Sequence, residues 1–328
     1  VALLKKRYGA HLSENARNAL DACRGYGPAF AIMNPLTRQI YVKLAIDEWS
    51  ATISQIDFPF TLEDTKIDGV DCVRYRTENT SPHAPVFLFI HASAFIAGSA
   101  RANASAVLPA CHLTGCECVS VDYTLAPDAV FPTQLEQIER VYLKLCEERG
   151  AENIVLFGDS AGATMALASL HRWRRKNIPH PASAVLVSPL ADAEPVSDTY
   201  VTLRKHDPIF SVPGAAGVKA IFELYAPGED YTNPEVSPIS GDFDGMPPLL
   251  IHVGSREIFL GDGARLAEKA RRAGVDVSLR VFDGLFHLFH MHWQIEDTKA
   301  AFSDIADFVK RTTRGAARPL TRPTAVSA

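Results

Sequence analysis

A serine stands at the centre of the pentapeptide Gly158–Gly162, whose sequence G-D-S-A-G fits the pattern G-x-S-x-G. The apolar run 153–157 precedes it, and the small residues of 163–168 follow it. A strand, a tight turn and a helix in that order expose a serine hydroxyl at the turn. Glycine permits close backbone approach there, and the first N–H groups of the helix can stabilise a developing oxyanion. The pattern therefore predicts that Ser160 is a nucleophile rather than part of an ordinary strand-to-helix turn.

A nucleophilic serine needs a general base, and His287 is the candidate. It follows the alternating segment 277–282, which predicts a late strand with the histidine on the loop behind it. Imidazole titrates near neutral pH, which suits proton transfer. His290 and His292 follow closely, so a structural histidine or a metal site is the alternative. No cysteine or carboxylate with ligand spacing accompanies them, and the sequence predicts neither a metal nor a cofactor.

Three ordered motifs make the chain resemble the hormone-sensitive-lipase-like branch of the α/β-hydrolases, the bacterial and fungal carboxylesterases. They are G-D-S-A-G at 158–162, D-Y-T-L-A-P at 122–127 with Phe131-Pro132 behind it, and G-L-F-H-L-F-H at 284–290. The resemblance runs from about residue 60 to 312. It implies an α/β-hydrolase fold, with a mostly parallel central sheet flanked by helices and a cap over the catalytic mouth.

The oxyanion motif departs from the family pattern. H-A-S-A-F at 91–95 stands where the family has H-G-G-G, directly after the apolar strand 86–90. By family position, the backbone donors to the oxyanion are Ser93, Ala94 and Ala161. Each donor of this kind is worth about 3 kcal/mol in the transition state. Alanine and serine keep the N–H group, but their Cβ atoms restrict the backbone and narrow the acyl pocket.

Three neighbouring residues are expected to support the site. His91 shapes the oxyanion loop by hydrogen bonding and transfers no proton. Phe95 lines the acyl pocket or packs in the interior. Asp159, beside the nucleophile, is expected to be a charge at the start of a helix.

The acid that orients His287 is the second departure. Arg256 occupies the position after strand 248–254 where the family places an aspartate. Glu257 comes next and has one more methylene of reach, but successive residues of an extended chain point in opposite directions. Glu257 is therefore the predicted acid provided that the loop bends differently by one residue. Two alternatives remain open: Asp262 is the acid, or the site has no normal acid. Asp262 is better explained as a residue of a helix N-terminus.

Strands and helices alternate along most of the chain, which predicts a mostly parallel sheet with helices on both faces. Two stretches that interrupt the alternation are interpreted as the cap of the family. The predicted parts are an N-terminal cap segment at 1–55, a catalytic core at 56–189 and 241–312, a cap insertion at 190–240, and a disordered tail at 313–328.

Composition excludes several classes of function. A chain of 328 residues that is 47% hydrophobic can bury one large core. Its net charge is −5 without a basic stripe, so nucleic acid is not an expected partner. No apolar run reaches about 18 residues, so we expect no membrane span. With six cysteines that lack disulfide spacing and no signal peptide at its start, the chain is expected to be cytoplasmic. Formation of a homodimer stays open.

The sequence therefore predicts a serine esterase that hydrolyses small short-chain carboxylic esters through an acyl-enzyme. A ligand-binding pseudoenzyme on the same scaffold is one alternative, because the oxyanion motif and the acid are both altered. Acyl transfer, amide hydrolysis or elimination of a carboxylate at the same site is the other.

Overall fold

An eight-stranded sheet runs through the computed structural model, which describes residues 11–23, 29–92 and 94–314. The strands are β1 (Phe60–Ile67), β2 (Val70–Thr77), β3 (Val86–Ile90), β4 (Glu117–Val121), β5 (Ile154–Asp159), β6 (Ser183–Val187), β7 (Leu249–Gly254) and β8 (Val277–Phe282). Their order across the sheet is β1-β2-β4-β3-β5-β6-β7-β8. β2 pairs antiparallel with β1 and with β4, and all other pairs are parallel. The carboxyl ends of β3, β5, β7 and β8 therefore meet at one edge, where ligands of open α/β sheets bind.

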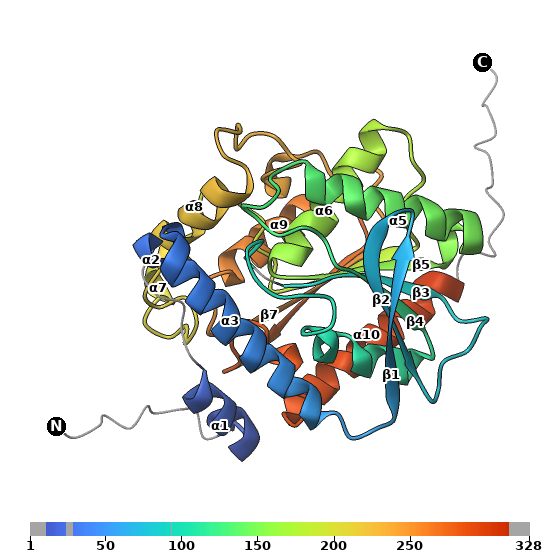
Figure 1. Ribbon diagram of the computed structural model, residues 1–328, viewed down its shortest axis with the longest axis horizontal. Helices are drawn as coiled ribbons and strands as arrows, with labels where there is room; N and C mark the ends of the chain where they lie inside the picture. Colours follow the sequence, from blue (N-terminus) through green and yellow to red (C-terminus); the bar gives the residue numbers. More distant parts are fainter. Residues whose placement is uncertain (1–10, 24–28, 93, 315–328) are drawn as a thin grey trace.

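Two layers of helices cover the sheet. They are α4 (Leu108–Thr114), α5 (Thr133–Arg149), α6 (Ala161–Arg175), α9 (Leu260–Arg272) and α10 (Glu296–Arg314). Figure 1 shows α5 and α6 on one side of the sheet and α10 on the other. Because side chains alternate along a strand, Leu88 and Leu156 join the core under α5, α6 and α9, while Phe87 and Phe157 join the core with α4 and α10. The α/β fold predicted from the sequence is confirmed.

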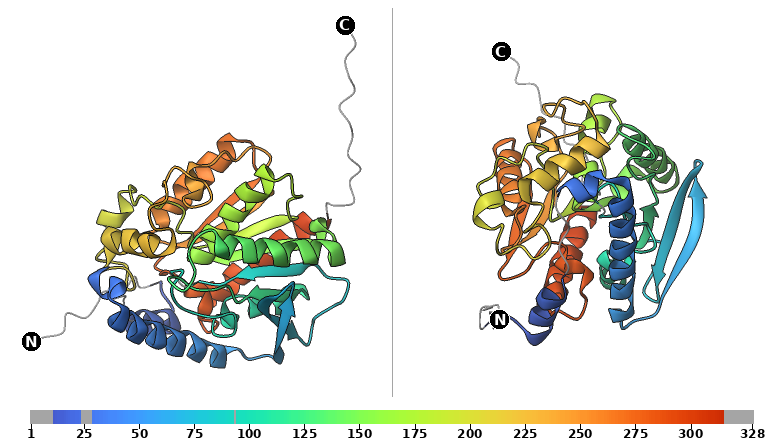
Figure 2. Two further views of the ribbon diagram at one scale, coloured as in Figure 1. Left: turned by 45° about the horizontal axis from the view of Figure 1, so that its top comes forward. Right: turned by 60° about the vertical axis from the view of Figure 1, so that its left-hand side comes forward.

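Two segments outside this sandwich contact each other through a helix of each. The first carries α1 (Glu14–Ala22), α2 (Ala29–Met33) and α3 (Pro35–Thr52), and the second carries α7 (Thr199–Thr202) and α8 (Gly214–Tyr225). Helix α2 packs against α8, as the right-hand view of Figure 2 shows.

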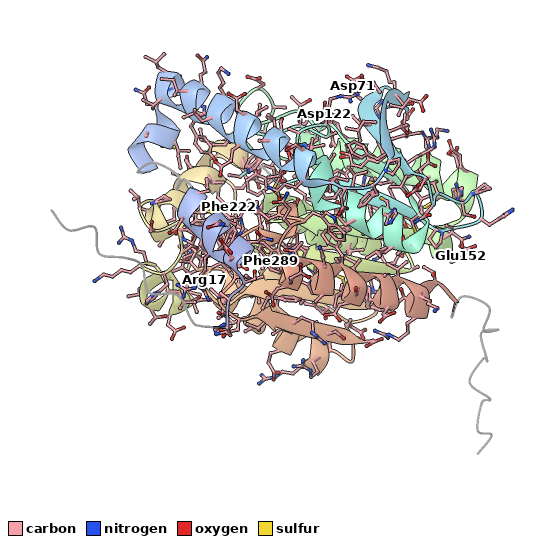
Figure 3. The ribbon with its side chains drawn as sticks, turned by 90° about the horizontal axis from the view of Figure 1, so that it is seen from below. Arg17, Asp71, Asp122, Glu152, Phe222 and Phe289 are labelled. Atoms are coloured by element: carbon pink, nitrogen blue, oxygen red, sulfur yellow. The ribbon has the colours of Figure 1, made fainter. Side chains whose placement is uncertain are left out.

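Helix α1 has a different position from α2 and α3. Ser13 caps it by accepting a hydrogen bond from the Ala16 N–H. Its apolar face packs on Phe286 and Phe289 of the loop that follows β8. Figure 3 shows α1, which carries Arg17, beside the segment that carries Phe289. Helix α1 therefore packs against the loop that follows β8 and supports it.

The predicted disordered tail begins too early. Helix α10 continues through Arg314, and its apolar stripe, which includes Ile305 and Phe308, packs in the core. Residues 313 and 314 are thus helical, and the rest of the predicted tail lies outside the described residues. No helix in the described part of the chain is long and apolar enough to cross a membrane.

Candidate active site

Ser160 occupies a sharp turn between β5 and α6. Its φ of +51° and ψ of −119° lie outside the regions that a serine ordinarily adopts. The turn depends on Gly162, where an added Cβ would stand 1.9 Å from the Ile90 carbonyl oxygen of β3. The Ser160 N–H donates to the Val187 carbonyl oxygen of β6 at 2.8 Å, which anchors the turn to the sheet. This is the strained geometry of a nucleophile elbow.

Three side chains from the carboxyl edge of the sheet form a continuous hydrogen-bonded chain. His287 Nε2 lies 2.9 Å from Ser160 Oγ, and His287 Nδ1 lies 2.8 Å from Glu257 Oε2. His287 and Glu257 are fully buried and Ser160 is 4% exposed. The structure thus brings together the three residues that the sequence predicted as nucleophile, base and acid.

The loop after β7 bends as Glu257 requires. The Arg256 N–H donates to the Leu285 carbonyl oxygen of the histidine loop, and the Ser255 hydroxyl donates to Asp283. These bonds tie the two loops together and hold Arg256 half-buried, while the Glu257 side chain points to His287.

Asp262 does not contact the histidine. It lies in the first turn of α9, fully buried, and its two oxygens accept hydrogen bonds from the Ser197 and Tyr200 hydroxyls at 3.0 Å each. Burial raises the pKa of Asp262 to about 7. Asp262 therefore links α9 to the segment around α7.

The oxyanion loop adopts the backbone conformation that glycine would favour, without having glycine there. Ala94 and Phe95 have φ values of +50° and +64°. Ser93 lies outside the described residues. Ala161 is the first residue of α6, so its N–H has no partner within the helix and is available to a ligand.

Several groups behind this loop hold it in place. The His91 Nδ1 atom lies 3.0 Å from the Ala92 carbonyl oxygen, to which Asn103 Nδ2 also donates. The Tyr123 hydroxyl donates to the His91 carbonyl oxygen, and the two rings stack 4.3 Å apart. Burial lowers the pKa of His91, so the imidazole is neutral and suited to a structural role.

The surroundings of Asp159 differ from the sequence expectation, whereas those of Phe95 fit one of its two expected roles. Asp159 is the last residue of β5 and is buried, and burial raises its pKa well above the usual range. This favours an uncharged carboxyl over the helix-start charge expected from the sequence. Phe95 is fully buried and stacks on Tyr225 of α8, with ring centroids 4.0 Å apart. Phe95 thus takes the packing alternative and joins the oxyanion loop to the insertion.

Two buried residues of the site were missed by the sequence analysis. Ser188 follows β6, and its hydroxyl donates to Glu257 Oε1 at 3.0 Å. Asp207 of the insertion accepts the Ile258 N–H, one residue beyond Glu257, at 2.9 Å. Nearby, the Phe210 ring packs edge-on against the His287 ring at 5.1 Å. Each missed residue precedes a proline in a loop, and that pattern predicts only a turn.

His290, which follows His287 in the sequence, pairs with another histidine and not with the candidate catalytic residues. His290 Nε2 lies 3.1 Å from His252 Nδ1 in a fully buried pair, and burial lowers the pKa of both. Across the described residues, no three His, Cys, Asp or Glu side chains gather in a way that could hold a metal ion.

Comparisons with known proteins show the family and the fold. A family model described as the alpha/beta hydrolase fold matches residues 87–291. An esterase of Acinetobacter venetianus is 34% identical over 224 residues, which are 67% of this chain and 72% of that protein. An acetyl-hydrolase of Streptomyces hygroscopicus is 29% identical over 70% of this chain and 76% of its own. The crystal structure of an esterase from the bacterial hormone-sensitive lipase family is 28% identical, with a TM-score of 0.76 over 81% of this chain and 89% of that one. The chain belongs to the α/β-hydrolase fold family, in its hormone-sensitive-lipase-like branch of carboxylesterases.

Proposed function

We propose that the protein is a serine esterase that hydrolyses short-chain carboxylic esters through an acyl-enzyme intermediate. The observation that carries the proposal is the chain of contacts from Ser160 Oγ through His287 to Glu257, with distances of 2.9 and 2.8 Å. A nucleophile, a base and an orienting acid within hydrogen-bond reach, at a strained turn, are the arrangement that activates a serine.

In the first half of the reaction, Ser160 Oγ attacks the ester carbonyl carbon while His287 Nε2 accepts the hydroxyl proton. Glu257 holds the proton on Nδ1, so that Nε2 is the free base, and stabilises the imidazolium that forms. His287 then donates its proton to the leaving alcohol as the carbon–oxygen bond breaks. A water molecule, activated by the same imidazole, hydrolyses the acyl-enzyme and restores Ser160.

The negative oxygen of the tetrahedral intermediate needs backbone donors. The N–H of Ala161 at the start of α6 is one candidate, with the helix dipole behind it. Ala94 and Ser93 are the others by family position. The positive φ of Ala94 supports this assignment, because the loop keeps a glycine-like course at that point.

The preference for short-chain esters is proposed to come from a small acyl pocket. Ala94 adds a Cβ where the family has glycine, and the Phe210 ring packs edge-on against the His287 ring. The descriptions of two similar proteins also refer to short acyl groups. One is named an acetyl-hydrolase, and a crystal of another, named EstE5, was soaked by p-nitrophenyl butyrate. Overpacking by even a few methylenes costs about 1–3 kcal/mol, which disfavours long acyl chains.

The segments with α2, α3, α7 and α8 are proposed to form the cap over this site. The contact of α2 with α8 and the stacking of Phe95 on Tyr225 support this division. The 4% exposure of Ser160 supports it as well, because the nucleophile lies beneath covering residues.

Turnover of p-nitrophenyl esters of two to twelve carbons tests both levels of the proposal. We expect steady release of p-nitrophenol by the wild type, none above background by Ser160→Ala, and the highest kcat/KM for acetyl to butyryl esters. A variant with glycine at 92, 93 and 94 should extend activity to longer chains. A wild-type optimum at eight carbons or more would contradict the short-chain assignment, and esters formed with added alcohols in preference to free acid would indicate acyl transfer.

A further inference from the structure

The carboxylate of Glu257 is held at both of its oxygens. Oε2 faces His287, whereas Oε1 accepts the Ser188 hydroxyl at 3.0 Å and the Gly254 N–H at 2.5 Å. Ser188 and Glu257 are both fully buried. The Ser188 hydroxyl is therefore the side-chain donor that fixes which way the carboxylate turns.

Ser188 keeps this hydroxyl in place at the expense of backbone strain. Its φ is +48°, a region that strains a residue with a Cβ and that glycine enters almost without strain. Its N–H donates to the His252 carbonyl oxygen of β7 at 2.7 Å, so the conformation is firmly held. A serine in a position that suits glycine points to a use for the hydroxyl.

The same hydroxyl also contacts the backbone of the histidine loop. It accepts the Leu288 N–H at 3.4 Å, and Leu288 directly follows His287. Ser188 thus bridges the acid loop and the histidine loop, and its position after β6 places it beside β7, the strand that leads into the acid loop.

We propose that Ser188 is a positioning residue of the reaction, which locks the longer side chain of Glu257 onto His287. Glutamate has one more rotatable bond than aspartate, so its carboxylate loses more rotamer freedom when it is fixed. Holding Oε1 from the far side restricts Glu257 to the rotamer whose Oε2 meets the imidazole. Ser188 acts through Glu257 and takes no direct part in the chemistry. The inference rests on the proposed esterase function.

Two substitutions at Ser188 separate this role from a merely structural one. Ser188→Ala removes the hydroxyl and keeps the strained backbone, whereas Ser188→Gly removes the hydroxyl and relieves the strain. Both variants should lower kcat for p-nitrophenyl acetate by about tenfold (~1.4 kcal/mol) with KM within about twofold, since the contact matters in the transition state. If Ser188 served only the fold, Ser188→Gly would keep the wild-type kcat, and that result would overturn the inference.

A double-mutant cycle with Glu257→Gln supplies the second measurement. Because Ser188 acts through Glu257, adding Ser188→Ala to Glu257→Gln should change kcat by less than about twofold. An equal, independent loss in both backgrounds would overturn the inference. Ser160→Ala is assayed in parallel. Turnover that survives in Ser160→Ala would defeat the proposed function itself, whereas an inactive Ser160→Ala with a fully active Ser188→Gly would defeat only the role of Ser188.

Discussion

Glu257 reaches His287 from one residue beyond Arg256, the position at which the family resemblance led us to expect an acid. The displacement is possible because the loop after β7 is fixed by its own contacts to the histidine loop, including the Arg256 N–H on the Leu285 carbonyl oxygen. A longer side chain then spans the remaining distance and ends 2.8 Å from Nδ1. At the residue scale, the fixed loop and the length of the glutamate side chain together bring the carboxylate to the imidazole.

The first prediction is that Glu257, and not Asp262, is the acid that orients His287. Glu257→Gln should lower kcat by roughly three to four orders of magnitude, because an amide can donate to Nδ1 and favour the wrong tautomer. Asp262→Asn is the matched control, since that carboxyl is buried at a distance from the histidine and contacts two hydroxyls. Its kcat should stay within a few-fold of wild type. The reverse ranking in steady-state assays would transfer the role to Asp262.

A second prediction at this scale concerns the strained oxyanion loop. Ala94 has a φ of +50°, whereas Ala92 is not among the residues of positive φ. Glycine relieves strain at 94 but only adds unfolded-state freedom at 92, so Ala94→Gly should be more stable than Ala92→Gly by about 1–2 kcal/mol. Urea unfolding of the two variants measures the difference. Equal stabilities would mean that the loop stores no strain at Ala94.

At the element scale, a buried carboxylate of the insertion, that of Asp207, binds the acid loop directly. Asp207 Oδ1 accepts the N–H groups of Ile209 and Phe210 at 2.8 Å, and Oδ2 accepts that of Ile258 at 2.9 Å. The same carboxylate thus shapes the turn that presents Phe210 to His287 and binds the residue after Glu257.

We predict that Asp207→Asn uncouples the two elements. The amide can still serve the turn through its oxygen, but its NH2 group would face the Ile258 N–H, donor against donor. A buried donor left unpaired costs about 1–3 kcal/mol of the free energy of unfolding, and kcat should fall as the acid loop loosens. Asp198→Asn, on the exposed surface of the same segment, is the control. Chemical denaturation and p-nitrophenyl acetate turnover check both effects, and identical behaviour of the two variants would refute the coupling.

The elements that hold the site were largely predictable, and the contacts between them were not. Alternation of apolar residues marked β8, and the glycines around Ser160 marked the elbow, because both are local patterns. Ser188 and Asp207 act on Glu257 and its neighbour from 69 and 51 residues away along the chain. Only the packed fold shows such partners. The bend that favours Glu257 over Arg256 likewise depends on the histidine loop, which the local sequence does not encode.

At the scale of the whole molecule, burial sets the response to acid. His171 of α6 is buried with its Nε2 2.9 Å from the Pro238 carbonyl oxygen, and burial lowers its pKa to about 4. The unfolded chain binds this proton near pH 6.5 and the folded protein does not, so stability from this group is present above pH 6.5 and is lost as pH falls toward 4.

Glutamine at this position can keep a donor to Pro238 but cannot titrate. Between pH 7 and pH 5, the wild type should therefore lose about 2 kcal/mol more of its free energy of unfolding than His171→Gln does. Urea unfolding of both proteins at the two pH values gives the comparison. Parallel losses in the two proteins would show that His171 titrates alike in both states.

The proposed hydrolysis depends on covalent chemistry at Ser160, and active-site labelling tests that chemistry most directly. The protein is treated with a serine-directed alkyl phosphonate. Its intact mass is then measured by mass spectrometry, and the adduct is located by peptide mapping. We predict one adduct per chain on the peptide that contains residues 158–162, and none on Ser160→Ala. An adduct on another residue, or equal labelling of Ser160→Ala, would contradict the account.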